Sequence, residues 1–130
     1  MKSIAEVLYG ARNRITEFDS WTQGTLAKDK DGNSVQPGDP AARQWCAIGA
    51  LAAEFPELDL NRAETPHMDK LSVLLQAKNA LIAVSGGSIM NINDLGRSRN
   101  QRRNHRAVLR CFDHASRRLA LRKAFEDNEL

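Results

Sequence analysis

The chain of 130 residues has little cysteine, few aromatic side chains and no long apolar run. Its two cysteines, Cys46 and Cys111, lie 65 positions apart, which matches no zinc or redox spacing and gives no disulfide framework. No stretch approaches the roughly 18 apolar residues of a membrane helix, and the N-terminus lacks the pattern of a signal peptide. No glycine pattern resembles a phosphate-binding loop. We therefore expect reduced cysteines, a cytoplasmic location, no membrane segment, no cofactor and no metal.

The composition provides enough apolar sequence for one core. Hydrophobic residues make up 42% of the chain and charged residues 27%. These values exclude wholesale disorder, and the length suits a single domain over residues 1–130. The net charge of +3 conceals an asymmetry, because residues 97–123 carry +9 and the remainder carries −6. Basicity is therefore a local property of one segment.

The apolar periodicity predicts a mainly all-α fold, an irregular bundle of about four helices. Ser3 and Glu6 have the spacing of a capping box, and apolar residues follow at helical spacing, which predicts a first helix over about 4–17. A turn-rich insertion separates this helix from the second one. Within the insertion, residues 25–28 and 34–36 are candidates for a short β-hairpin.

The second helix is predicted over residues 40–54. Asp39 is a suitable N-cap, proline is favoured at the first helical position, and Pro56 prevents continuation. Trp45 occupies the apolar face of this helix, so we expect its side chain to be largely buried.

Two further helices follow. Thr65 and Pro66 repeat the cap-then-proline start, which predicts a third helix to about Val84. Residues 88–97 are rich in side chains that bond locally to the backbone, which favours a loop. The last helix is predicted over 99–124.

Several residues have both a chemical and a structural interpretation. A nucleophilic Cys46 would need a lowered pKa, but it lies about seven residues past the predicted helix start, where the helix dipole has faded. Cys111 and His114 have the spacing of two metal ligands, but zinc would need two more, and a core thiol with a surface imidazole is the favoured interpretation. Gly49 lies within a predicted helix, which indicates close approach of another backbone or of a ring such as Trp21.

The last predicted helix separates its charges from its apolar residues. The face opposite the apolar stripe carries Arg99, Arg103, Arg106, Arg110 and Arg117. Two interpretations stay open: a solvated surface that aids solubility, or a site for a polyanion, either an acidic protein surface or nucleic acid. This face has no aromatic residue that could stack on bases, which argues against single-strand recognition.

Three blocks of the sequence, taken together, resemble a small bacterial and phage domain family of unknown function. They are Trp21-Thr22-Gln23-Gly24 with Asp31-Gly32, then Trp45-Cys46-Ala47-Ile48-Gly49-Ala50-Leu51, then Asn93-Asp94. The resemblance covers most of the chain and implies a shared fold, but it supplies no activity, cofactor or catalytic residue. It implies one structural cluster, or else a pocket, formed by Trp21, Gly24, Trp45, Cys46, Gly49, Asn93 and Asp94.

The leading hypothesis is a non-enzymatic binding protein, such as a phage or mobile-element accessory factor, that engages a host macromolecule through its basic C-terminal helix. One alternative is a small hydrolase or transferase with a cleft around Cys46, Asn93 and Asp94. Another alternative is a nucleic-acid-binding protein. The sequence does not determine the oligomeric state.

Overall fold

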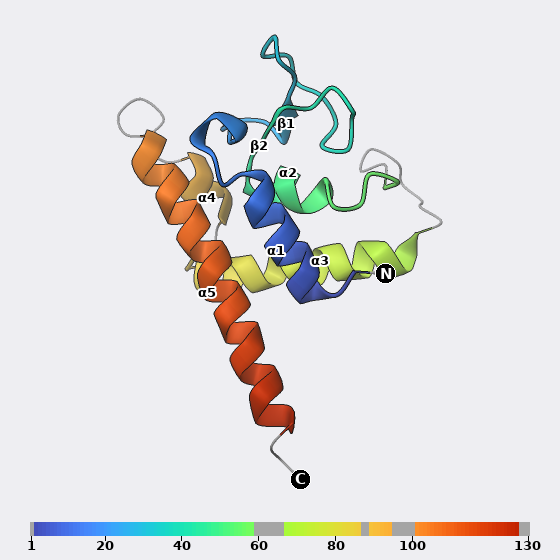
Figure 1. The fold of residues 1–130 in the computed structure, drawn as a ribbon, viewed down its shortest axis with the longest axis vertical. Helices are drawn as coiled ribbons and strands as arrows, with labels where there is room; N and C mark the ends of the chain where they lie inside the picture. Colours follow the sequence, from blue (N-terminus) through green and yellow to red (C-terminus); the bar gives the residue numbers. More distant parts are fainter. Residues whose placement is uncertain (1, 59–66, 87–88, 95–100, 128–130) are drawn as a thin grey trace.

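The computed structural model describes residues 2–58, 67–86, 89–94 and 101–127. Within these ranges the chain is mainly helical, with a small antiparallel sheet between the first two helices, so the predicted fold class is confirmed. Figure 1 shows the sheet and its loops at one end of the molecule and α3 running crosswise to α5. The elements are α1 Ile4–Arg14, the 3₁₀ turn Phe18–Ser20, β1 Ala27–Lys28, β2 Gln44–Trp45, α2 Ala47–Ala52, α3 Met68–Val84, α4 Ile89–Asp94 and α5 Gln101–Asp127.

The predicted capping box begins α1. The Glu6 amide donates to Ser3 Oγ at 3.1 Å, and the Ser3 amide donates to Glu6 Oε1 at 3.2 Å. Two backbone donors that have no partner within the helix are thereby satisfied. The helix ends at Arg14, earlier than predicted, because the backbone departs from helical geometry at Ile15.

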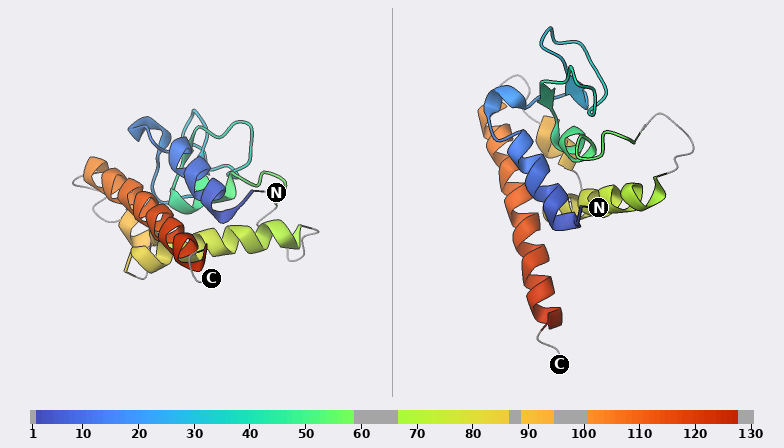
Figure 2. Two further views of the ribbon diagram at one scale, coloured as in Figure 1. Left: turned by 60° about the horizontal axis from the view of Figure 1, so that its bottom comes forward. Right: turned by 45° about the vertical axis from the view of Figure 1, so that its right-hand side comes forward.

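The core lies where α1 meets α2, α3 and α5, with α4 packed against α2 and α5. Its largest fully buried side chains include Phe112, Leu8, Ile15, Leu51, Leu81 and Ile89. Figures 1 and 2 show that the C-terminal part of α5 extends well beyond the other elements. All side chains from residue 120 to residue 127 are exposed.

The prediction of one helix over 40–54 is wrong. Only Ala47–Ala52 is helical, and Asp39 instead forms a turn in which its Oδ1 accepts from the Ala41 amide at 2.8 Å. The N-cap of α2 is Cys46, whose Sγ accepts from the Gly49 amide at 3.3 Å. Asp39 and Pro40, which have the pattern of a helix start, therefore form a turn and not the first turn of a helix.

Strand pairing explains why the helix starts late. Gln44–Trp45 pairs antiparallel with Ala27–Lys28, which holds the two residues before Cys46 in extended geometry. The predicted hairpin partner, 34–36, contributes only an isolated bridge between Lys28 and Ser34. The insertion therefore folds against the start of α2 rather than upon itself alone.

Trp45 is only partly buried, contrary to the prediction, because it lies in β2 and not on a helix face. Its indole nitrogen donates to the Pro37 carbonyl at 2.9 Å. The guanidinium of Arg14 lies 5.1 Å from the centre of its ring, a cation–π contact. Trp45 thus joins the loop before α2 to the end of α1.

The third helix ends at Val84 as predicted, while its predicted start at Thr65 and Pro66 lies outside the described residues. The predicted loop over 88–97 is wrong in part, because α4 occupies Ile89–Asp94. Ile89 is 1% exposed, so burial against the core stabilises a short helix that local preferences do not favour.

Candidate functional site

Asn93, near the end of α4, joins segments that are far apart in the sequence. Its side chain is fully buried. Its Oδ1 accepts from Trp21 Nε1 at 2.8 Å and from the Ala47 amide at 3.0 Å. Its Nδ2 donates to the Thr22 carbonyl at 3.1 Å and to Asp94 Oδ1 at 2.9 Å. The carboxamide therefore uses both acceptor and both donor positions.

The segment 21–24 also contacts α4 through two further hydrogen bonds. Gln23 Nε2 donates to the Asn93 carbonyl at 2.8 Å, and the Gly24 amide donates to Asp94 Oδ1 at 3.2 Å. Gly24 has a φ of +80°, a backbone conformation that glycine adopts readily. The segment is thereby held along the end of α4.

The middle motif block completes this arrangement. The Trp45 carbonyl accepts from the Thr22 amide at 3.1 Å, and the Cys46 amide donates to the Leu26 carbonyl at 3.1 Å. A Cβ at Gly49 would overlap the Leu26 carbonyl oxygen and lie 2.7 Å from its carbon. The close neighbour of Gly49 is therefore the Leu26 backbone and not the Trp21 ring.

The structure thus brings the seven motif residues into one region around Asn93, which we call the Asn93 junction: Trp21, Gly24, Trp45, Cys46, Gly49, Asn93 and Asp94. The junction is not an open cleft around the thiol, because Cys46 is 1% exposed and Asn93 is 0% exposed. Cys46 is the N-cap of α2 and does not lie seven residues past a helix start, so that part of the sequence argument is wrong. Burial nevertheless raises the pKa of its thiol, because this effect outweighs the amide hydrogen bonds from Gly49 and Ile48, which lower the pKa. A raised pKa disfavours the thiolate that a nucleophile requires.

We expect Cys46 to resist alkylation by iodoacetamide at neutral pH in the native protein and to react once the chain is unfolded. The physical reason is the absence of solvent access together with the raised pKa of the thiol. Mass spectrometry of peptides from native and unfolded samples measures the modification, and a Cys111→Ala variant removes the second thiol as a source of signal. Rapid native modification of Cys46 would instead favour the enzyme hypothesis.

Cys111 and His114, which have the spacing of two metal ligands, do not face a common site. Cys111 is 9% exposed within the core, whereas His114 is exposed on α5. Across the described ranges, no group of three or more His, Cys, Asp or Glu side chains is arranged to hold a metal ion.

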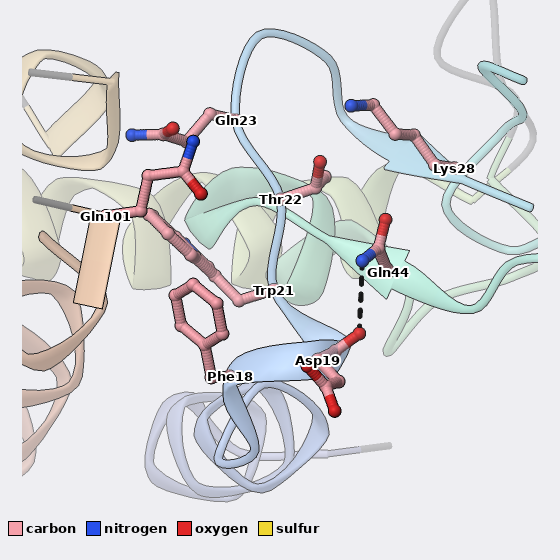
Figure 3. Close-up of a pocket in the computed structure, with 8 residues that line it drawn as sticks. All are labelled: Phe18, Asp19, Trp21, Thr22, Gln23, Lys28, Gln44 and Gln101. Atoms are coloured by element: carbon pink, nitrogen blue, oxygen red, sulfur yellow. Dashed lines mark hydrogen bonds between the residues drawn. The ribbon is translucent and has the colours of Figure 1, made fainter. Parts of the chain in front are cut away.

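A hollow of about 380 Å³ lies beside the Asn93 junction. Figure 3 shows its lining, in which Phe18 and Trp21 are joined by the polar side chains of Gln23, Lys28, Gln44 and Gln101. Trp21 connects the hollow to the junction, because its ring lines the hollow while its Nε1 donates to Asn93. Sequence reasoning missed Gln44 and Gln101, since neither belongs to a motif.

An aromatic cluster supports one side of this hollow. The ring centres of Trp21 and His105 are 5.4 Å apart, and those of Phe18 and His105 are 5.6 Å apart. His105 is 6% exposed, and its Nε2 lies 2.6 Å from the Ile15 carbonyl oxygen. The cluster ties the segment after α1 to the N-terminal part of α5.

The predicted basic stripe lies on the outer face of α5. Arg103, Arg106, Arg110 and Arg117 are exposed, while Arg99 lies outside the described residues. Asp113, the one acidic residue of this helix before Lys123, is bound by Arg12 of α1 with nitrogen–oxygen distances of 2.7 and 3.3 Å. The negative charge of Asp113 is therefore paired with Arg12 across the contact between α1 and α5.

Sequence reasoning missed two exposed apolar side chains on α5. Leu121 is 60% exposed and Phe125 is 74% exposed. They follow Arg117 at successive intervals of four residues, so the three side chains share one face of the helix. Their exposure could have been predicted from the helical periodicity, because Leu121 and Phe125 lie outside the apolar face that ends at Leu119.

These features define a mainly helical domain in which a buried asparagine joins the segment 21–24 to α2 and α4. A family model described as a family of unknown function, DUF6197, matches residues 1–118, and the chain belongs to this family. Comparisons with curated proteins and with solved structures gave no match. Among the residues placed in the structure, no helix combines the length and apolarity needed to cross a membrane.

Proposed function

We propose that this protein is a non-enzymatic binding protein that engages an acidic protein surface through the outer face of α5. The observation that carries the proposal is the set of exposed arginines on that face, with the nearby Asp113 already bound by Arg12. Such a concentration of one charge attracts an oppositely charged macromolecule and accelerates its association.

The exposed apolar residues favour a protein partner over nucleic acid. Leu121 and Phe125 continue the face that carries Arg110 and Arg117, and α5 projects beyond the body of the molecule there. A protein groove can cover apolar anchors at helical spacing while acidic residues at its rim pair with arginines. A phosphate backbone offers charge but little apolar surface for these two side chains.

Duplex nucleic acid is the second candidate, because the same arginines could neutralise phosphates. The enzyme hypothesis has less support. The side chains on which it depends, Cys46 and Asn93, are buried, and Asn93 uses its full hydrogen-bonding capacity within the fold.

We expect replacement of Arg106, Arg110 and Arg117 by glutamine to abolish partner binding while changing the free energy of unfolding little. Exposed charges contribute little to stability, and glutamine is a good helix former. Proteins retained from host lysate by the wild type are identified by mass spectrometry, purified and measured by calorimetry against both proteins. A variant with lysine at the three positions retains the charge and serves as the matched control.

Two further comparisons separate the candidate partners. Leu121→Gln combined with Phe125→Gln should weaken binding of a protein partner and leave the affinity for duplex DNA or RNA unchanged. Binding of duplex that equals protein binding in strength, with steep salt dependence, would favour the second candidate. Equal retention of all partners by the wild type and by the triple glutamine variant at low salt would leave the stripe as an ordinary solvated surface.

A further inference from the structure

The hollow beside the Asn93 junction takes no part in the proposed function, yet its lining is built from four parts of the chain. Residues 18–23, β1, β2 and the first residue of α5 all contribute to it. Its volume of about 380 Å³ falls within the range of small-molecule sites. Its polar lining favours a ligand that is recognised by hydrogen bonds and charge.

One hydroxyl of the lining is accessible from the hollow. Thr22 is 6% exposed as a residue, and its Oγ1 makes no hydrogen bond to any residue that the structure describes. A hydroxyl can donate one hydrogen bond and accept others. Thr22 therefore offers a hydrogen-bonding group directed to an occupant of the hollow.

Two carboxamides of the lining are oriented in advance. Gln44 Nε2 donates to the Asp19 carbonyl at 3.1 Å, as Figure 3 shows, and Gln23 Nε2 donates to the Asn93 carbonyl at 2.8 Å. Figure 3 shows the Oε1 atom of Gln44 on the side of Thr22 and Lys28, whereas the carboxamide of Gln23 is directed toward α4. Acceptors held in this way match the amino and ring N–H groups along the edge of a nucleobase.

The remaining lining supplies further groups that a nucleotide needs. Lys28 makes no ion pair with any described residue, so its ammonium group can bind a phosphate. The Asp19 carboxylate at the rim can accept from ribose hydroxyls. The Phe18 ring is already in contact with the Arg102 guanidinium, which lies 4.5 Å from its ring centre. Among the described residues of the lining, Lys28 is the one cationic side chain, which suits one phosphate group rather than three.

We infer that the hollow is a binding site for a nucleoside monophosphate, with the base toward Gln44 and the phosphate at Lys28. The site is separate from the outer face of α5, so it does not depend on the proposed function. Replacement of the α5 arginines by glutamine should accordingly leave the affinity for nucleotide unchanged.

The test uses the full chain labelled with ¹⁵N and titrated with AMP, GMP, CMP and UMP. We expect at least one nucleotide to shift the indole cross-peak of Trp21, which lines the hollow, and to leave that of Trp45 in place. Lys28→Gln should weaken the nucleotide by about tenfold and leave the weaker binding of the matching nucleoside unchanged, because only the phosphate contacts this residue. Lys30→Gln, an exposed lysine in the next turn, is the matched control and should bind like the wild type.

Three results would each overturn the inference. The first is the absence of a Trp21 shift with all four nucleotides. The second is equal affinity of the wild type and Lys28→Gln, with melting temperatures that show both to be folded. The third is inorganic phosphate binding as tightly as the nucleotides, which would mean that the hollow recognises an anion alone.

Discussion

Replacement of Asn93 by alanine is expected to leave most of the protein unfolded at physiological temperature. The change removes the acceptor for Trp21 Nε1 and the Ala47 amide, and the donor for the Thr22 carbonyl. Each buried group left without a partner costs about 1–3 kcal/mol, and the cavity adds to this loss. A total loss of about 4 kcal/mol or more is comparable to the whole stability of a marginal domain.

Asn93→Asp separates the acceptor role of the Asn93 side chain from its donor role. The aspartate keeps an oxygen for Trp21 and Ala47 but places a second oxygen against the Thr22 carbonyl and Asp94 Oδ1. Burial and these oxygens raise the pKa of the introduced carboxyl in the folded state. Its protonated form can donate, so the stability deficit relative to the wild type should shrink as pH falls through that raised pKa.

Chemical denaturation followed by circular dichroism measures both variants against the wild type. Asn79→Ala is the control, because Asn79 is exposed on α3 and should change the free energy of unfolding by no more than about 0.5 kcal/mol. Asn93→Ala with a wild-type denaturation midpoint would show that the four hydrogen bonds of the junction contribute little to the fold.

The helices that were predicted well are those determined by local signals. The capping box at Ser3 and Glu6 and the helical spacing of apolar residues in α3, which ends at Val84, depend on residues a few positions apart. The basic stripe of α5 was also visible, because its period follows from the helix alone. In each case the residues that determine the structure are neighbours in the sequence.

The features that were missed depend on distant partners. Asp39 and Pro40 have the form of a helix start, but pairing of Gln44–Trp45 with Ala27–Lys28 keeps the chain extended up to Cys46. The fold of α4 likewise depends on burial of Ile89 and Asn93 against the core. Local preference cannot reveal such effects, since tertiary packing overrides it.

The candidate sites likewise depend on residues that are far apart in the sequence. The role of Asn93 arises from partners some seventy positions away, and no local pattern distinguishes it from a loop asparagine. The polar hollow combines Gln44, Lys28 and Gln101 from three separate segments. Trp21 takes part in both features, so loss of the junction should also deform the hollow. Nucleotide binding is therefore best tested on variants that leave Asn93 intact.

Gly49→Ala is a second change with a large expected effect on the free energy of unfolding. Helix propensity alone predicts that it stabilises the protein, whereas the packing around Gly49 predicts that it destabilises it. Alanine in place of glycine within a helix stabilises it by about 1 kcal/mol when nothing else changes. In this fold, however, the new Cβ would overlap the Leu26 carbonyl oxygen. That oxygen accepts from the Cys46 amide at 3.1 Å, so it cannot move without disturbing the start of α2.

We therefore expect Gly49→Ala to destabilise the protein by about 3 kcal/mol, the upper part of the usual range for overpacking. Gly10→Ala is the matched control, because a Cβ there would meet the side-chain carboxylate of Glu54. That group can shift by weakening its ion pairs with Lys2 and Arg14, so its loss should be smaller. Urea denaturation of both variants measures the difference, and a stabilised Gly49→Ala protein would show that helix preference outweighs the contact with Leu26.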